Sequence, residues 1–391
     1  MIDHVSGYYK VGDRVFMSKM EACIHSTSVN QPVTFHFYDE LWTAANDMYQ
    51  HNPLVNLEEM YKQRALQIRA NYGYLVLHFS GGADSTTILD TFLKNNIKLD
   101  EIFVLIPKKI LGSELHKPNM HDTSATNMLS EWDFTIKPKL DYVRANYPDI
   151  KIVVHDWTDA LNDVKITDDL LLKQNHNFGL PNFGFNESFS PSNLEYENKG
   201  VRVANIVGTD KPILVYNSQT DTYSTCFLDT TLVGASYQHG FNKIDVTSKV
   251  YFYYAIDYTE LALARAYVAA TFFKNNPEYN KLIDITIRKD KSRKELLDMG
   301  KVVDRLVNTL MYPNWNINTF QVDKPDNFNK IYHPWFNYIY QTNEFDEKHT
   351  LLRNKIQEFG RSISRKNKTV DIHGNMLGLN ILTTKQYKLK I

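Results

Sequence analysis

A glycine-containing turn between an apolar run and an amphipathic run constrains this chain more than any other feature of its sequence. Residues 74–79 read Tyr-Leu-Val-Leu-His-Phe, which predicts a buried β-strand. In residues 86–96 apolar side chains recur at helical spacing, which predicts an α-helix. The turn between them, residues 80–85, reads Ser-Gly-Gly-Ala-Asp-Ser. A strand that passes through glycines into a helix directs backbone N–H groups and the positive end of the helix dipole at one place, which suits a phosphate or pyrophosphate.

The same turn resembles a known nucleotide-binding loop. Ser-Gly-Gly-x-Asp-Ser at a strand-to-helix turn is similar to the pyrophosphate loop (PP-loop) of the N-type ATP pyrophosphatases, the adenine nucleotide alpha-hydrolase-like superfamily. The resemblance covers about residues 74–104 and continues more loosely to about residue 212. The turn lacks the Gly-Lys-Ser/Thr of a Walker A loop and the Gly-x-Gly-x-x-Gly of a dinucleotide fingerprint. Abundant Asn, Lys and aromatic residues add the hypothesis of a phage-encoded member.

The resemblance implies an ATP site with Mg²⁺ at this loop. It implies that the loop holds the β- and γ-phosphates of ATP, that Asp84 helps to hold the metal, and that Asp84 and Ser85 take part in catalysis. The residues expected to contact the nucleotide here are Ser80, Gly81, Gly82, Ala83, Asp84, Ser85 and Thr86. The alternative is a plain glycine turn in which Asp84 and Ser85 only cap a helix.

Two further loops are expected at the same edge of the sheet. Gly208 follows a predicted strand over residues 201–207 and is expected to contact the nucleotide. Asp210 would be a second metal ligand, and Lys211 would act in catalysis by neutralising charge on the α-phosphate. An ordinary turn explains this stretch equally well.

The second of these loops follows the predicted strand over residues 102–106. In the family, the end of this strand seats adenine and ribose, so Lys108 is expected to contact the nucleotide, and Lys109 is a further candidate for contact with phosphate or substrate. Lysines in a solvated loop are the alternative for at least one of the two.

The order of strand and helix patterns predicts an α/β fold. Strands are expected over residues 74–79, 102–106, 150–156 and 201–207, with helices over residues 86–96, 124–146 and 161–176. This alternation predicts a doubly wound, Rossmann-like parallel sheet with ligands at the carboxyl ends of its strands. We expect an N-terminal appendage (residues 1–72), a nucleotide domain (73–235), and a mostly helical, aromatic-rich domain (236–391) that closes over the site.

The flanking regions also carry readable patterns. The appendage is expected to contain a hairpin over residues 8–16 and a helix over 54–71. Residues 34–40 alternate between apolar and polar side chains, which predicts either an extra edge strand or the lip of a pocket. The C-terminal domain is expected to contain helices over residues 258–274 and 296–310. Its aromatic residues are candidates for substrate recognition, with a core role as the commoner alternative: Tyr253, Trp315 and Trp335.

Charge and hydropathy limit the kinds of binding partner and the cellular location that we expect. The formal net charge of −1 gives no general argument for nucleic acid. Residues 353–391 carry nine Lys or Arg against two acidic residues, which keeps nucleic-acid binding open beside a solvated charged face. No run of eighteen apolar residues and no signal peptide are seen, so we expect no membrane span and a cytoplasmic location, the host cytoplasm if the protein is viral.

The number and positions of the cysteines limit the reactions that we expect the protein to catalyse. Cys23 and Cys226 predict no disulfide framework, and the His-Asp pairs match no zinc pattern. Position 2 is Ile2, whereas the glutamine-dependent relatives carry a cysteine there. The predicted protein is an enzyme that forms AMP and pyrophosphate while adenylating a substrate oxygen for attack by an amine, ammonia or sulfur nucleophile.

Two alternatives to that reaction stay open. One is a cysteine-dependent enzyme, either a sulfurtransferase or a reductase similar to those acting on adenylyl sulfate. The other is a non-catalytic ATP-binding module. The partner is expected to be a small-molecule or nucleotide substrate, and a homodimer stays open.

Overall fold

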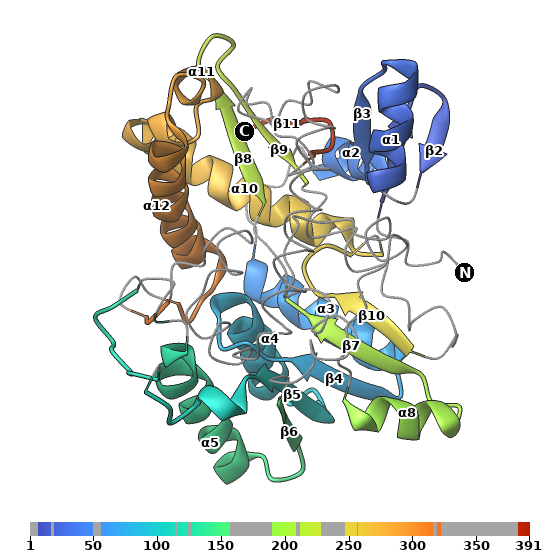
Figure 1. The fold of residues 1–391 in the computed structure, drawn as a ribbon, viewed down its shortest axis with the longest axis vertical. Coiled ribbons are helices and arrows are strands. Elements are labelled where there is room, and N and C mark those ends of the chain that lie inside the picture. Colours follow the sequence, from blue (N-terminus) through green and yellow to red (C-terminus); the bar gives the residue numbers. More distant parts are fainter. Residues whose placement is uncertain are drawn as a thin grey trace, which may run out of the picture.

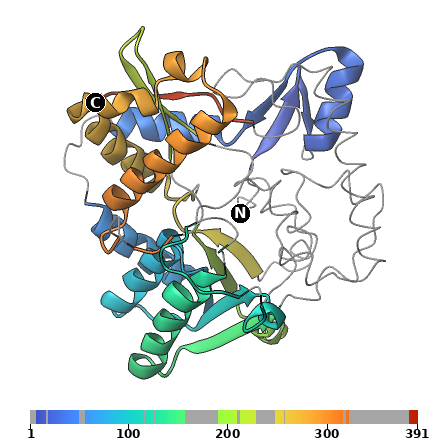
Figure 2. The same ribbon diagram turned by 60° about the vertical axis from the view of Figure 1, so that its left-hand side comes forward.

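The structure is a computed structural model, and Figure 1 shows its fold. It describes residues 7–16, 19–49, 56–114, 116–123, 127, 129–156, 190–208, 212–227, 247–255, 257–315, 319–321 and 382–391. Figures 1 and 2 show a parallel sheet with its helices in the lower half and a second group of helices and strands in the upper half.

The lower half is built on one five-stranded parallel sheet, so the chain has an α/β fold. The strand order is β10-β7-β4-β5-β6 and every neighbouring pair is parallel. The strands are β4 (Tyr74–His78), β5 (Glu101–Ile106), β6 (Lys151–Asp156), β7 (Val203–Val207) and β10 (Thr247–Tyr251). β4, the first of them in the chain, lies in the centre, and the order of the strands reverses there.

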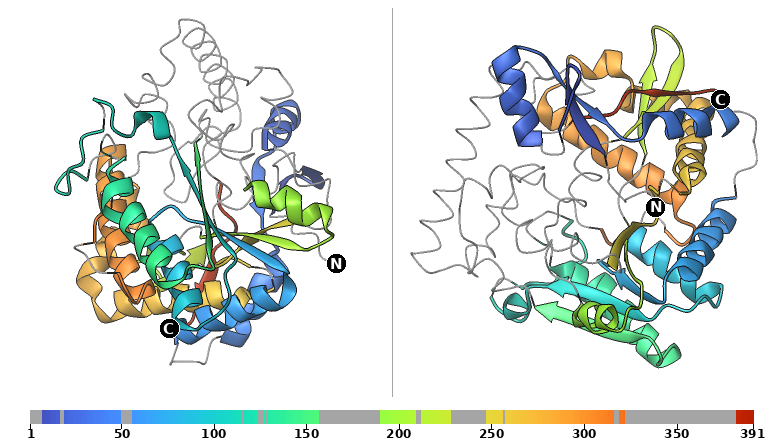
Figure 3. Two further views of the ribbon diagram at one scale, coloured as in Figure 1. Left: turned by 90° about the horizontal axis from the view of Figure 1, so that it is seen from below. Right: turned by 90° about the vertical axis from the view of Figure 1, so that its right-hand side faces the viewer.

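Helices cover both faces of this sheet because β4 is apolar on both sides. Leu75 and Leu77 share one buried cluster with Ile88 and Phe92, whereas Val76 packs on the opposite face. That opposite face carries α8, whose Tyr196 packs against the cluster there. The helices of this half are α3 (Leu57–Asn71), α4 (Ala83–Lys94), α5 (Lys137–Asn146) and α8 (Pro191–Asn198). Figure 3 shows the sheet and these helices from below.

The predicted strands of the sheet are confirmed, and two helix boundaries differ from expectation. α4 begins at Ala83 rather than at Thr86, because the extended backbone of Gly82 (φ −74°, ψ 171°) serves as its N-cap. Asp84 and Ser85 therefore lie in the first helical turn. The predicted helix over 124–146 is interrupted: a π-helical turn, η3 (Trp132–Ile136), precedes α5. The predicted helix over 161–176 lies outside the described residues.

The fifth strand comes from a segment that the sequence analysis assigned to the helical domain. β10 lies beyond residue 235 and pairs in parallel with β7, with Val250 opposite Ile206. Val250 is buried, and Phe252, Tyr253 and Tyr254 beyond the strand are buried as well. A short edge strand of five residues gives little periodic signal, and its partner strand lies far away in the sequence. Part of the 236–391 segment thus belongs to the sheet, while the domain boundaries stay predictions.

The upper half combines two long helices with a small antiparallel sheet. The predicted helices over 258–274 and 296–310 are confirmed as α10 (Thr259–Asn275) and α12 (Arg293–Met311). Between them lie η5 (Pro277–Leu282) and α11 (Ile285–Arg288). The sheet has the order β11-β9-β8, formed by β8 (Ile213–Asn217), β9 (Thr222–Cys226) and β11 (Tyr387–Leu389). The sequence analysis did not predict these three strands; Figure 3 (right) shows β11 in red across the β8–β9 hairpin.

The N-terminal segment forms a second antiparallel sheet. Its strands are β1 (Tyr8–Val11), β2 (Arg14–Phe16) and β3 (Val33–His36), in the order β2-β1-β3. The predicted hairpin between β1 and β2 is confirmed, and Gly12 adopts the positive φ (+59°) that its turn needs. The helices of this segment are α1 (Lys19–Val29) and α2 (Asp39–Tyr49).

α2 joins this segment to the end of the chain. The side-chain amide of Asn46 donates to the Lys388 carbonyl at 2.8 Å, and the Tyr387 hydroxyl donates to Asp39 Oδ1 at 2.8 Å. In the ranges described above, no helix is both long and apolar enough to cross a lipid bilayer.

Candidate functional site

The loop after β4 is held in shape by one buried hydroxyl group. The backbone N–H of Ser80 donates to Ser85 Oγ at 3.2 Å, and this hydroxyl lies 3.3 Å from the Gly82 carbonyl oxygen that accepts from it. Ser85 is buried, whereas Ser80 is exposed. Ser85 therefore closes the loop onto the start of α4, and its predicted catalytic role stays a prediction.

The two glycines of the loop face different surroundings. Gly81 has a φ of +76°, and a Cβ there would lie 2.5 Å from Thr135 Oγ1 and 2.6 Å from Ile136 Cγ1. Gly81 is therefore required by close packing against η3. For Gly82 the nearest described heavy atom to such a Cβ is Ser80 Oγ, at 3.6 Å. The Gly82 side of the loop is thus the side from which a ligand can approach the backbone.

The start of α4 offers backbone donors at this open side. Gly82 has no side chain with which to cap the helix, and the first intrahelical bond runs from Thr86 N–H to the Gly82 carbonyl at 3.0 Å. The N–H groups of Ala83, Asp84 and Ser85 precede that bond, so they have no acceptor within the helix. Such groups, together with the helix dipole, favour an anion.

Gly208 lies against the same loop from the neighbouring strand. A Cβ on Gly208 would be 2.9 Å from Ile88 Cδ1 and 3.0 Å from Asp84 Cβ. The end of β7 therefore meets the loop after β4, at the place where the strand order reverses. Asp210 and Lys211, which follow Gly208, lie outside the described residues, and their predicted roles stay predictions.

Asp84 is tied to the upper half of the molecule. Its Oδ1 accepts a hydrogen bond from the Tyr312 hydroxyl and lies 3.7 Å from Arg265 Nη2. Its backbone carbonyl accepts from the Tyr253 hydroxyl at 2.8 Å. The side chain of Asp84 is 23% exposed, so water still reaches it. Oδ2 takes part in neither of the two carboxylate contacts.

This donor set fits a magnesium ion that arrives with a phosphate ligand. Within the described part of the chain, no group of three His, Cys, Asp or Glu side chains is placed to hold a metal. Mg²⁺ is commonly held by one or two carboxylates, with substrate phosphates and water completing its octahedron. Oδ2 of Asp84 has no hydrogen bond or ion pair with the residues that the structure describes, which suits that arrangement and does not suit a metal held by protein ligands alone.

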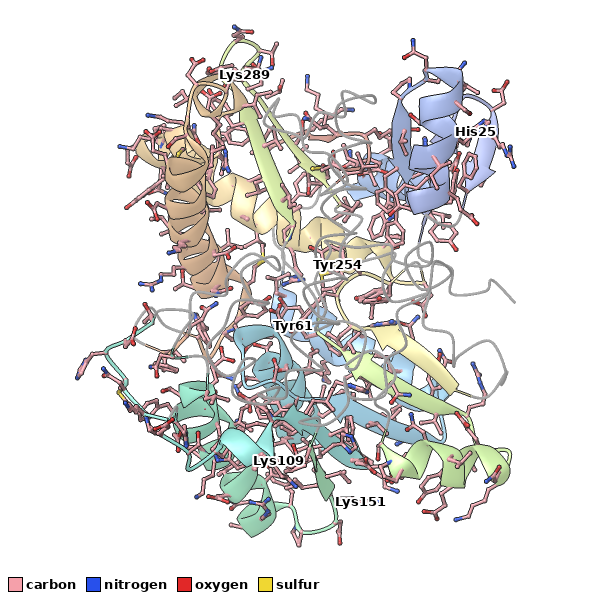
Figure 4. The ribbon with its side chains drawn as sticks, viewed as in Figure 1. His25, Tyr61, Lys109, Lys151, Tyr254 and Lys289 are labelled. Carbon is pink, nitrogen blue, oxygen red and sulfur yellow. The ribbon has the colours of Figure 1, made fainter. Side chains whose placement is uncertain are left out.

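The guanidinium beside Asp84 is enclosed by aromatic rings. Arg265 is 0% exposed, and its guanidinium carbon lies 4.0, 5.4 and 5.9 Å from the ring centroids of Tyr253, Tyr312 and Tyr254. We call these three residues the tyrosine cage. Tyr61 packs beside it, with its ring centroid 5.5 Å from that of Tyr253. Figure 4 shows Tyr61 and Tyr254 in the middle of the molecule, between the parallel sheet and α10.

The hydroxyl groups around Arg265 stay protonated. Burial raises the pKa of Tyr61 to about 12; the charge of Arg265 opposes this shift and that of Asp84 adds to it. Burial also raises the pKa of Tyr253 and of Tyr312 well above the usual 10. These side chains are therefore neutral hydroxyl donors at physiological pH. An arginine stays charged in proteins, so the cage holds a cation next to the loop carboxylate.

Sequence reasoning missed Arg265 and Tyr312. The available signal was Arg265 itself, a charged residue in the middle of the apolar run that forms α10. Arg is almost never fully buried unless it is paired, so such a residue indicates a hidden partner. Of the aromatic candidates for substrate recognition, Tyr253 is fully buried in the cage and Trp315 is half-buried against the core. Trp335 lies outside the described residues.

The two predicted lysines after β5 also lie in the lower half of the molecule. Lys108 and Lys109 are exposed in η1 (Lys108–Ile110), directly after β5 (Figure 4). The Lys108 backbone N–H donates to Asp156 Oδ1 at 2.9 Å, which fixes the end of β5 beside the end of β6. Lys108 thus lies at the carboxyl edge of the sheet, one strand away from the loop.

The cysteines and the basic segment add little to the site. Cys226 is buried, and burial raises the pKa of its thiol to about 12, so it is a poor nucleophile. Cys23 lies in α1. Residues 353–381 of the basic segment lie outside the described residues, and the remainder contains β11.

Comparisons of the chain with protein-family models, with curated proteins and with solved structures find no match in any of the three. The function of the chain is therefore inferred from the geometry of the site. That geometry combines an open glycine, a row of backbone donors and one partly exposed carboxylate at the carboxyl end of a central parallel strand.

Proposed function

We propose that the chain is an ATP-dependent enzyme that forms AMP and pyrophosphate, with the phosphate chain of ATP bound at residues 80–86. The observation that carries this proposal is the open side of Gly82. Beside it lie the first N–H groups of α4, which have no acceptor within the helix. The position of the loop supports it, because ligands of open α/β sheets bind where the strand order reverses. The proposal includes the doubly wound, Rossmann-like class and membership of the N-type ATP pyrophosphatases.

The chemistry follows from charge that develops on the leaving group. An oxygen of the acceptor attacks the α-phosphorus of ATP, the bond from that phosphorus to the bridging oxygen breaks, and the electron pair leaves with pyrophosphate. Backbone N–H groups of residues 83–85 stabilise that growing negative charge. Bound Mg²⁺, held through Asp84, would supply further neutralisation of the phosphates. An amine, ammonia or sulfur nucleophile then attacks the acceptor carbon that bears this oxygen, the carbon–oxygen bond breaks, and AMP leaves with the oxygen and the electron pair.

The cysteine-dependent alternative has weaker support. A cysteine nucleophile needs an accessible thiol with a lowered pKa. Cys226 has the opposite properties, since it is buried and its pKa is raised to about 12. We therefore favour a reaction in which the nucleophile comes from a second substrate, a small molecule or nucleotide present in the cytoplasm.

Binding of ATP is tested first, with a variant that closes the open side of the loop. Gly82 has extended backbone angles that alanine also adopts, so Gly82→Ala should fold while its methyl group blocks the approach of phosphate. We expect ATP to bind at least about tenfold more weakly, equivalent to ~1.4 kcal/mol, in isothermal titration calorimetry. Gly300→Ala is the matched control, because a Cβ there meets no heavy atom of the described residues within 4 Å.

Catalysis is tested separately, by following labelled AMP and pyrophosphate with candidate acceptors present. Formation of both products, lost in Asp84→Asn, is the expected result. Absence of ATP binding in the unaltered protein overturns the proposal. Tight binding without pyrophosphate release over hours, for every acceptor class, identifies instead a non-catalytic ATP-binding module.

A further inference from the structure

We propose that Tyr312 and Arg265 are positioning residues for Asp84: they hold one oxygen of its carboxylate and so set how the other oxygen meets the cation that accompanies the nucleotide. This inference rests on the proposed function. It assigns part of the nucleotide site to the helical upper half, because Arg265 belongs to α10 and Tyr312 directly follows α12.

A relay of hydrogen bonds carries the contact. Arg265 Nη2 donates to the Tyr312 hydroxyl oxygen at 2.6 Å, and the Tyr312 hydroxyl donates to Asp84 Oδ1. The Tyr253 hydroxyl donates to the Asp84 carbonyl at 2.8 Å. Asp84 is thus held at both its side chain and its backbone. A functional side chain that is held by packed neighbours keeps a defined geometry, and such supporting residues orient metal ligands.

The relay itself is rigid because its members are buried. Arg265 and Tyr253 are 0% exposed and Tyr312 is 1% exposed. The guanidinium lies over the face of the Tyr253 ring, an arrangement that favours a cation in a site without water. Oδ1 of Asp84 is engaged from this interior side, which leaves Oδ2 as the oxygen for a metal ion.

A positioning role and a purely electrostatic role of Arg265 predict opposite changes in Mg²⁺ affinity when the residue is altered. Removing the positive charge of Arg265 would by itself tighten a cation at Asp84, whereas loss of positioning would weaken it. Tyr312→Phe avoids this conflict, since it removes the hydrogen bond to Asp84 and leaves every charge in place. It also keeps the ring that packs on Arg265.

The test is a titration with Mg²⁺ of ATP binding to the full chain, read from the fluorescence of a labelled ATP analogue. We expect Tyr312→Phe to raise the half-saturating Mg²⁺ concentration about tenfold, within the range seen when a residue that orients a metal ligand is removed. Tyr267→Phe is the matched control: it also lies in the upper half and is buried, and its hydroxyl donates to Asn46 Oδ1 instead. We expect the control to stay within twofold of the unaltered protein.

A double variant makes the test specific. In the Asp84→Asn background, Tyr312→Phe should add no further change to the Mg²⁺ dependence, because its route through the carboxylate is gone. If Tyr312→Phe leaves the Mg²⁺ dependence unaltered, or shifts it as much in the Asp84→Asn background, the inference is wrong while the proposed function stands. If the unaltered protein binds no ATP at any Mg²⁺ concentration, both are wrong. Thermal unfolding of each variant shows whether it is folded.

Discussion

Two buried arginines, Arg64 on α3 and Arg265 on α10, differ in the side chains that surround them, and the difference separates a structural contact from a contact at the candidate site. Arg64, on α3, donates from Nη1 to Gln67 Oε1 at 2.7 Å and to Asp257 Oδ1 at 3.0 Å. Its Nη2 donates to the Tyr251 carbonyl at 2.8 Å. Burial lowers the pKa of Arg64, and the charge of Asp257 opposes that shift. Arg64 thus ties α3 to the end of β10.

Arg265 has a different set of neighbours. It lies among aromatic rings and reaches its carboxylate, Asp84, through the Tyr312 hydroxyl. Asp257 is 43% exposed and lies outside the candidate site, whereas Asp84 lies in the first turn of α4, next to the loop after β4. The comparison teaches that a buried cation is informative when its counter-charge lies in a candidate site, and only structural when its counter-charge lies at the surface.

The largest effect expected from this comparison is on stability. Asp84→Asn removes the carboxylate with which the buried Arg265 is paired and should cost about 3 kcal/mol of unfolding free energy, the cost typical of breaking a buried ion pair. Asp257→Asn removes a carboxylate that water already screens and should cost below about 1 kcal/mol. Urea unfolding measures both. Equal losses in the two variants would show that Arg265 and Arg64 are alike.

A second variant tests whether the end of β7 packs closely against the start of α4. Gly208→Ala places a Cβ 3.0 Å from Asp84 Cβ and 2.9 Å from Ile88 Cδ1, so β7 or α4 must shift. We expect a cost of about 1–3 kcal/mol, typical of overpacking, together with weaker ATP binding. Gly300→Ala should be neutral or stabilising. Retained stability and ATP affinity in Gly208→Ala would contradict a close junction.

The pH dependence of stability sharpens the comparison further. The unfolded chain ionises Tyr61 near pH 10 and the folded protein near about 12, because burial raises its pKa. The stability linked to Tyr61 is therefore fully present below pH 10 and is lost as the pH rises towards 12. One proton gives a slope of at most about 1.4 kcal/mol per pH unit. Tyr61→Phe should flatten the alkaline loss in urea unfolding; an unchanged slope would place the ionising group elsewhere.

The smallest effect is expected at the far end of α12. Glu295 and Ser292 form a capping box there, and the hydrogen bonds from the backbone and hydroxyl of Ser292 and from Lys291 lower the pKa of Glu295 to about 2. A lowered pKa contributes stability above the unfolded value of 4.5, and this contribution is lost as the pH falls through 2. Glu295→Ala should reduce the acid dependence of unfolding. It should leave the Mg²⁺ dependence of ATP binding unaltered, and a change there would weaken the specific role of Tyr312.

The local parts of this structure could be predicted from the sequence, because their signals are local. Apolar runs, helical spacing and the two glycines predicted β4, the loop and α4, and only the start of α4 was placed too late. The glycine requirement is a backbone property, so it is visible without knowledge of the partners.

The distant parts could not be predicted, because their partners are remote. Tyr312 and Asp84 are 228 residues apart, and nothing in either neighbourhood indicates the other. The same holds for β10, which pairs with β7, and for β11, which pairs with β9 from the end of the described chain. The buried Arg265 was visible in the sequence as an anomaly, but its counter-charge was not.

The contact of Asp84 with Tyr312 and Arg265 also affects the order in which parts of this protein fold. The loop is specified within a dozen residues, yet the support for its acidic side chain arrives only when segments distant in the chain have docked. Contacts of such wide separation form slowly, since a long stretch of chain must be closed before they are gained. We therefore expect the proposed nucleotide site to be completed late in folding, and a fragment that ends at residue 235 to contain the loop without the residues that hold Asp84 in place.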